Sequence, residues 1–167
     1  MAVPWRACAA IEKFVRGVCD GVIADGCHVT KLLSLEAILR ELSSPAMYPQ
    51  NLDPARGRVL TIHMREADYR AASFLDDRVL TRESEGAWVP YPRLAEAVAR
   101  MEGDARPLHF IFHIGHAGST LLSRLLDELG GVLPLREPLP LRTLAEAPDA
   151  ERLKTFARLW RRGLRPY

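Results

Sequence analysis

The chain has 167 residues, of which 48% are hydrophobic and 26% are charged, and its formal net charge is +2. This length and composition fit one domain with an ample core. Basic residues gather at positions 152–165 and could attract a polyanion, but we interpret them as a solvated helix face and expect no nucleic-acid partner. Charged residues interrupt every apolar run before the roughly eighteen residues that a transmembrane helix needs, so we expect no membrane span.

The cysteines argue against disulfides and metal. Cys8, Cys19 and Cys27 are three in number, and their spacing fits neither a disulfide framework nor a CxxC zinc pair. Cys27-His28 lacks a second ligand pair at metal-binding spacing. We therefore expect free thiols and no metal. Because charged residues at 12 and 13 break the apolar N-terminal patch, it does not resemble a signal peptide, and we expect a cytoplasmic protein.

The N-terminal region, residues 1–45, is expected to be helical. Apolar residues recur at helical spacing in residues 5–18 and in residues 30–42, before a stop at Ser43-Ser44-Pro45. One face of the second helix would either pack in the core or dock a partner helix. Its apolar residues are Leu32, Leu35, Ile38, Leu39 and Leu42.

A turn-rich stretch at residues 49–57 predicts a boundary near residues 45–57. Alternating apolar residues and β-branched side chains then favour strands, helical spacing favours helices, and prolines oppose regular structure. The expected elements are a strand at 58–64, a short helix at 66–75, a short strand at 78–81, a loop at 84–92 and a helix from Pro92 to 101.

The stretch LHFIFHI, residues 108–114, is almost continuously apolar, as is typical of a central parallel strand covered on both faces. It leads into the loop GHAGST, residues 115–120, and then into a helix at 121–129. The pattern predicts a P-loop-type α/β domain over residues 58–167, with a partial parallel sheet flanked by helices. The remaining expected elements are an extended run at 132–135 and helices at 141–147 and 148–163.

A strand that feeds a glycine-containing loop into a helix makes an anion site, because backbone N–H groups and the positive end of the helix dipole converge there. Gly115 and Gly118 allow a close backbone approach, while Ser119 and Thr120 offer hydroxyl groups. A nucleoside-triphosphate loop would need lysine after the second glycine, so an ATPase or GTPase is disfavoured. A tight turn without a ligand is the alternative interpretation.

Residues 112–126, FHIGHAGSTLLSRLL, resemble the 5′-phosphosulfate-binding loop of the sulfotransferases, in which a strand is followed by P-[RK]-S-G-[ST]-T-x-L and a helix. The resemblance implies that the chain binds 3′-phosphoadenosine 5′-phosphosulfate and transfers its sulfuryl group to a hydroxyl or amine acceptor that the sequence does not identify. It assigns cofactor binding to Gly115, Ala117, Gly118, Ser119, Thr120 and Leu121.

Two further residues receive catalytic roles from this resemblance. His116 stands where the family usually has arginine or lysine to stabilise charge on the bridging oxygen, and this is a departure from the pattern. Glu137 follows the second short strand, as does a glutamate that serves as general base in some family members. The alternatives are a solvated loop histidine and a surface ion pair between Glu137 and Arg136. Arg136 and Arg142 could also assist anion binding. His109 and His113 are expected to be core histidines.

The resemblance is specific only at residues 108–138, and the family's later 3′-phosphate-binding segment is not matched, so a C-terminally incomplete member is expected. The alternatives are a non-catalytic anion- or nucleotide-binding module and a helix-mediated interaction module. An incomplete sheet would expose an edge strand and apolar helix faces, so either a homo-oligomer or poor solubility is expected.

Overall fold

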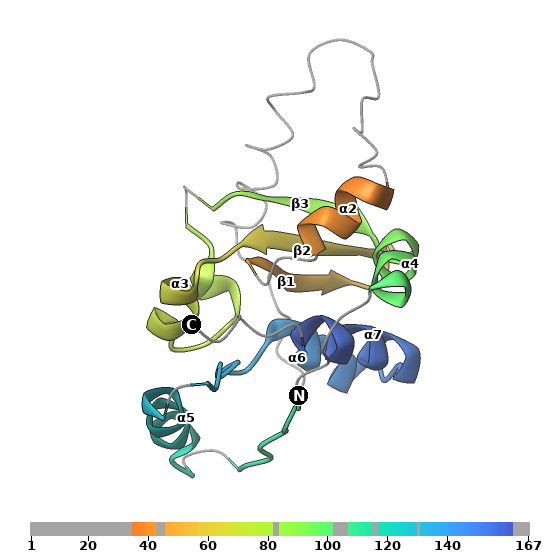
Figure 1. The fold of residues 1–167 in the computed structure, drawn as a ribbon. Helices are drawn as coiled ribbons and strands as arrows, with labels where there is room; N and C mark the ends of the chain where they lie inside the picture. Colours follow the sequence, from red (N-terminus) through yellow and green to blue (C-terminus); the bar gives the residue numbers. More distant parts are fainter. Residues whose placement is uncertain are drawn as a thin grey trace. The chain divides into compact units, whose positions relative to one another are not determined.

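The computed structural model describes residues 35–42, 46–81, 84–101, 107–114, 117–129 and 131–161, all within one compact unit, Ser34–Tyr167. The helix expected at residues 5–18 and the three cysteines lie outside the described residues. The described part is a mixed α/β structure (Figure 1). Its elements are α2 Leu35–Leu42, β1 Met47–Asp53, β2 Arg58–His63, α3 Glu66–Ala71, the 3-10 helix η1 Asp77–Val79, β3 Gly86–Pro90, α4 Tyr91–Arg100, α5 Ser119–Glu128, α6 Leu139–Glu146 and α7 Ala150–Trp160.

The three strands form one antiparallel sheet in the order β1-β2-β3 (Figure 1). β1 and β2 are joined by a turn in which the N–H of Gly57, with a φ of +59°, donates to the Pro54 carbonyl. Glycine adopts this left-handed conformation without steric cost. In the β2–β3 pair a Cβ at Gly86 would lie 2.4 Å from the Thr61 carbonyl oxygen. Only glycine therefore allows this approach of the two strands.

The expected parallel sheet is not present among the described residues, because their strands pair only as antiparallel neighbours. Two expected irregular stretches were also wrong: part of 49–57 belongs to β1, and most of 84–92 belongs to β3 and α4. Prolines are tolerated in both strands because each lies at an edge of the sheet, and β1 has a bulge between Pro49 and Asn51.

The strand expected at 78–81 is instead the 3-10 helix η1. Its N-cap is Asp76, whose carboxylate accepts a hydrogen bond from the Arg78 backbone N–H at 3.1 Å. This local hydrogen bond satisfies a backbone N–H group that in a strand would need a partner on a neighbouring strand. The expected strand at 58–64 and the expected helices after residue 65 are confirmed with shifted ends, and the helix expected at 66–75 ends at Ala71.

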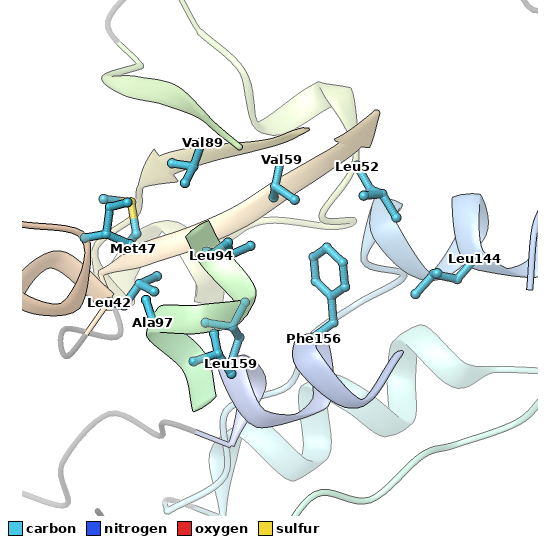
Figure 2. Packing of buried hydrophobic residues seen from close by; sticks show 12 residues of the cluster. Leu42, Met47, Leu52, Val59, Val89, Leu94, Ala97, Leu144, Phe156 and Leu159 are labelled. Carbon is cyan, nitrogen blue, oxygen red and sulfur yellow. The ribbon is translucent and has the colours of Figure 1, made fainter. Parts of the chain in front are cut away.

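One core lies between one face of the sheet and helices α2, α4, α6 and α7. Figure 2 shows Phe156 of α7 with its ring pointing toward Val59 and Leu52 of the sheet, and Leu144 of α6 beside it. Ile38 and Leu42 of α2 are buried in the same cluster, so the apolar face of this helix belongs to the core. The sequence left open that this face docks a partner helix. Its described side chains are instead covered by the core.

A second core lies on the opposite face of the sheet, because alternate residues of a strand point to opposite sides. In β2, Val59 belongs to the first cluster and its neighbour Leu60 to the second. Tyr48 and Tyr69 pack edge to face there, with ring centroids 5.6 Å apart. Partly buried residues 133 and 135, which follow α5, pack against this second cluster. The chain after α5 therefore returns to the sheet.

Candidate anion-binding site

The described part of the predicted anion-binding loop, residues 117–120, leads into the start of α5. Gly118 is the N-cap residue, with a φ of 79° and a ψ of 16°, in the left-handed region that favours glycine. The Leu122 N–H donates to the Gly118 carbonyl at 3.0 Å and closes the first turn. The earlier N–H groups of a helix have no intrahelical partner, and a glycine N-cap has no side chain to satisfy them. Within the described residues, the N–H groups of Ser119, Thr120 and Leu121 have no hydrogen-bond partner and are available to an anion, whereas the Ala117 N–H donates to the Ile114 carbonyl at 3.3 Å.

The predicted ligand residues around this start are exposed or half-buried. Ala117, Gly118 and Thr120 are exposed, Ser119 is half-buried, and Leu121 is 64% exposed. Gly115 and His116 lie outside the described residues. The arrangement gives an open helix end with two neighbouring hydroxyl-bearing residues, and such an end favours phosphate or sulfate groups.

The strand expected before this loop does not form among the described residues. Residues 107–114 have no regular secondary structure, and Phe112 and Ile114 are 92% and 82% exposed. His109 and His113 are exposed as well, so their assignment to the core was wrong. A continuous apolar run predicts a strand only where neighbouring strands are available. The described sheet pairs only its own three strands and does not pair with this run.

The extended run expected at 132–135 also has no strand partner in the described part of the chain. It leads to a short pairing with residue 75: the Leu75 N–H donates to the Arg136 carbonyl at 2.7 Å, and the Leu139 N–H donates to the Leu75 carbonyl at 3.1 Å. These bonds fix the backbone on both sides of Glu137.

Arg136 is a buried structural residue, with a side chain only 7% exposed. Its guanidinium donates to the carbonyls of Tyr69, Arg70 and Ala72 at 3.5, 3.1 and 2.6 Å. The last carbonyls of a helix lack intrahelical donors, so Arg136 caps the C-terminal end of α3 from a distant part of the chain. It is therefore not an exposed anion ligand, and the proposed surface pair with Glu137 is wrong.

The Arg136 guanidinium also contacts α5. Its Nε donates to the Ser123 hydroxyl at 2.7 Å, and that hydroxyl donates to the Thr120 carbonyl at 3.1 Å. Asp127, one turn further along α5, lies 3.6 Å from Arg136 and forms a close ion pair with Arg70 of α3. The structure thus links the two segments singled out in the sequence, 117–120 and 136–137, through Ser123.

Sequence reasoning did not identify Ser123 or Asp127. Serine four residues after Ser119 and an aspartate in the last turn are ordinary features of an exposed helix face, so neither marks a contact with residue 136.

An open pocket of about 520 Å³ lies beside Asp127 and is lined in part by Arg70, Arg124 and Glu128. Asp127 pairs with two of the pocket's arginines, so most of its charges compensate one another. We therefore do not assign an anion to this pocket.

Glu137 is exposed and has a φ of 48°. A positive φ is uncommon for a residue with a Cβ and often marks a functional position. Its charge contributes to a raised pKa of Arg78, whose main cause is the hydrogen bond from Arg78 to Asp76. The guanidinium of Arg78 also lies 4.0 Å from the centre of the Phe74 ring. Glu137 therefore lies near the Arg78 guanidinium, which already interacts with Asp76 and Phe74.

The described residues contain no group of three metal-ligating side chains, and none of their helices is long and apolar enough to cross a membrane. The metal-free protein expected from the sequence remains a prediction.

The chain matches no family model, no curated protein and no solved structure. The resemblance to sulfotransferases therefore rests on the residues of the loop and its flanks.

Proposed function

We propose that the chain is a sulfotransferase-like protein that binds 3′-phosphoadenosine 5′-phosphosulfate at Gly115–Thr120. The observation that supports the proposal most is the left-handed Gly118 at the start of α5, followed by two hydroxyl-bearing residues. The residues present fit the anionic end of the donor, since the free N–H groups and the helix dipole both favour negative charge there.

In the proposed reaction an acceptor oxygen or nitrogen forms a bond to the sulfur, and the bond from the sulfur to the phosphate oxygen breaks. The products are the sulfated acceptor and 3′-phosphoadenosine 5′-phosphate. Glu137 takes the acceptor proton, and the helix start together with His116 stabilises charge on the departing phosphate. The link from Arg136 through Ser123 to the Thr120 carbonyl supports this assignment, because it keeps the Glu137 segment near α5.

The binding step is tested by calorimetric titration with 3′-phosphoadenosine 5′-phosphate, with ATP as the control ligand. We expect saturable binding that is selective over ATP. Gly118→Val should abolish it, because a β-branched residue does not adopt a φ of 79° without strain. The matched control is Gly57→Val, which imposes a similar strain at a φ of +59° in the β1–β2 turn. Equal binding by the two variants would remove the loop from the proposal.

The chemical step is tested with Glu137→Gln once an acceptor has been found by screening. This variant should bind 3′-phosphoadenosine 5′-phosphate normally and lose sulfuryl transfer, because the amide cannot take the proton. Full transfer by Glu137→Gln would exclude the residue as the base.

A non-catalytic interaction module is the second candidate function. It is favoured by the number of large apolar side chains that are exposed between residues 110 and 132. These are Phe110, Ile111, Phe112, Ile114, Leu121, Leu122, Leu125, Leu129 and Val132. Large exposed apolar side chains that gather in one stretch of the chain favour a binding role. Binding of neither nucleotide by the folded chain would favour this candidate.

A further inference from the structure

We infer that residues 108–114 form an interface with a second copy of the chain, as an antiparallel pair of strands related by a two-fold axis at Ile111. The starting observation is the segment's lack of partners. Between residues 107 and 113 no backbone hydrogen bond joins the segment to the rest of the described chain. An extended apolar run with open N–H and C=O groups is a template for pairing with another chain.

The sequence of the segment identifies the partner. LHFIFHI reads almost the same in both directions about Ile111, with leucine at one end and isoleucine at the other. In an antiparallel pair with itself, each residue lies opposite one of its own kind: Phe110 opposite Phe112, His109 opposite His113, and Leu108 opposite Ile114 of the other copy. A two-fold interface requires this self-complementarity.

The side chains divide between the two faces of such a pair. Alternation places Leu108, Phe110, Phe112 and Ile114 on one face. The rings of Phe110 and Phe112 already lie 6.2 Å apart, centre to centre, in one copy. Pairing would bring four phenylalanine rings together, and aromatic cross-strand pairs are among the more stabilising ones.

The exposed side chains set the size of the interface. Phe110, Ile111, Phe112 and Ile114 are 46%, 50%, 92% and 82% exposed. At about 200 Å² for a large apolar residue, they offer roughly 500 Å² in each copy and about 1,000 Å² in a pair, which is the upper bound of what the two copies can bury here. The two α5 helices would then start at opposite ends of the two-stranded ribbon.

Sedimentation velocity tests the oligomeric state. We expect a dimer in the wild-type chain, and Phe112→Lys should raise the dimer dissociation constant about a hundredfold, because each dimer would lose two buried rings. The matched control is Leu153→Lys, which changes a 39% exposed leucine of α7 and should leave the dimer intact. A wild-type monomer at all concentrations, or equal effects of both variants, would overturn the inference.

Disulfide trapping tests the register. In a background with Cys8, Cys19 and Cys27 replaced by serine, Ile111→Cys should cross-link two copies, since residues on the two-fold axis have Cα atoms about 4.5–5.5 Å apart. Ile114→Cys should not, because its two copies would lie about 20 Å apart along the strands. Residue 114 is the more exposed of the two, so random collisions would give the opposite order. Faster trapping at 114 would exclude the register.

Discussion

Helices α4 and α5 have the same length of 10 residues and opposite surroundings. α4 buries Leu94, Ala97 and Val98, whereas α5 has no buried residue, although both have apolar residues at helical spacing. α4 follows β3 directly and packs against the sheet through its buried residues. Polar contacts through Ser123 and Asp127 join α5 to Arg136 and Arg70. Helical spacing therefore predicts a helix but does not say whether its apolar face is covered.

The largest predicted difference in the free energy of unfolding is between leucine substitutions in these two helices. Leu94→Ala is expected to lower the free energy of unfolding by about 3–4 kcal/mol, because it opens a cavity at a fully buried position. Leu125→Ala, at a 57% exposed position, should cost less than about 1 kcal/mol. Urea denaturation of the two variants measures the difference. Similar losses for both would mean that α5 buries its leucines in solution.

An intermediate effect is expected at the polar attachment of α5. Arg136→Ala should lower the free energy of unfolding by about 2–3 kcal/mol, because three carbonyl groups and Asp127 lose their donor. Arg124→Ala is the matched control, since this exposed arginine has no hydrogen bond or ion pair within the described part of the chain. Urea midpoints compare the two. Equal stability of both variants would exclude Arg136 as a structural link.

The smallest effect concerns the cap of η1. Hydrogen bonds from Arg78 hold the pKa of Asp76 below its usual value, so this carboxylate stabilises the fold above pH of about 4, and the contribution is lost as pH falls through the lowered pKa. Asp76→Asn should cost about 0.5–1 kcal/mol at pH 7 and less at pH 3. Glu146→Gln, at an exposed carboxylate without a described partner, is the control. A deficit in Asp76→Asn that is unchanged between the two pH values would contradict this assignment.

The elements with a strong local signal could be predicted from the sequence. The alternation in residues 58–63 and the helical spacing in α4 to α7 each gave the right element. β1 and β3 were missed because prolines argue against strands, whereas pairing with β2 on the outside of the sheet tolerates them. Pairing between separate strands cannot be recognised from a short stretch of residues.

The anion site itself stays a prediction. Gly118 was singled out because glycine allows a close backbone approach, and the structure has this residue in the left-handed conformation at the N-cap of α5. The role of Arg136 was not predictable, because its partners in α3 lie more than sixty positions away in sequence. The run at 108–114 was predicted to be buried because its composition fits a central strand, but composition does not provide a partner strand.

The attachment of α5 through charged side chains has a consequence for its response to salt. Arg70 is partly exposed, so its attraction to Asp127 weakens as dissolved ions screen it over about 10 Å at 0.1 M ionic strength. The apolar contacts that hold α4 are not screened in this way. Rising ionic strength should therefore loosen α5 before the sheet, and amide hydrogens of α5 would exchange with solvent through local opening while those of β2 remain protected.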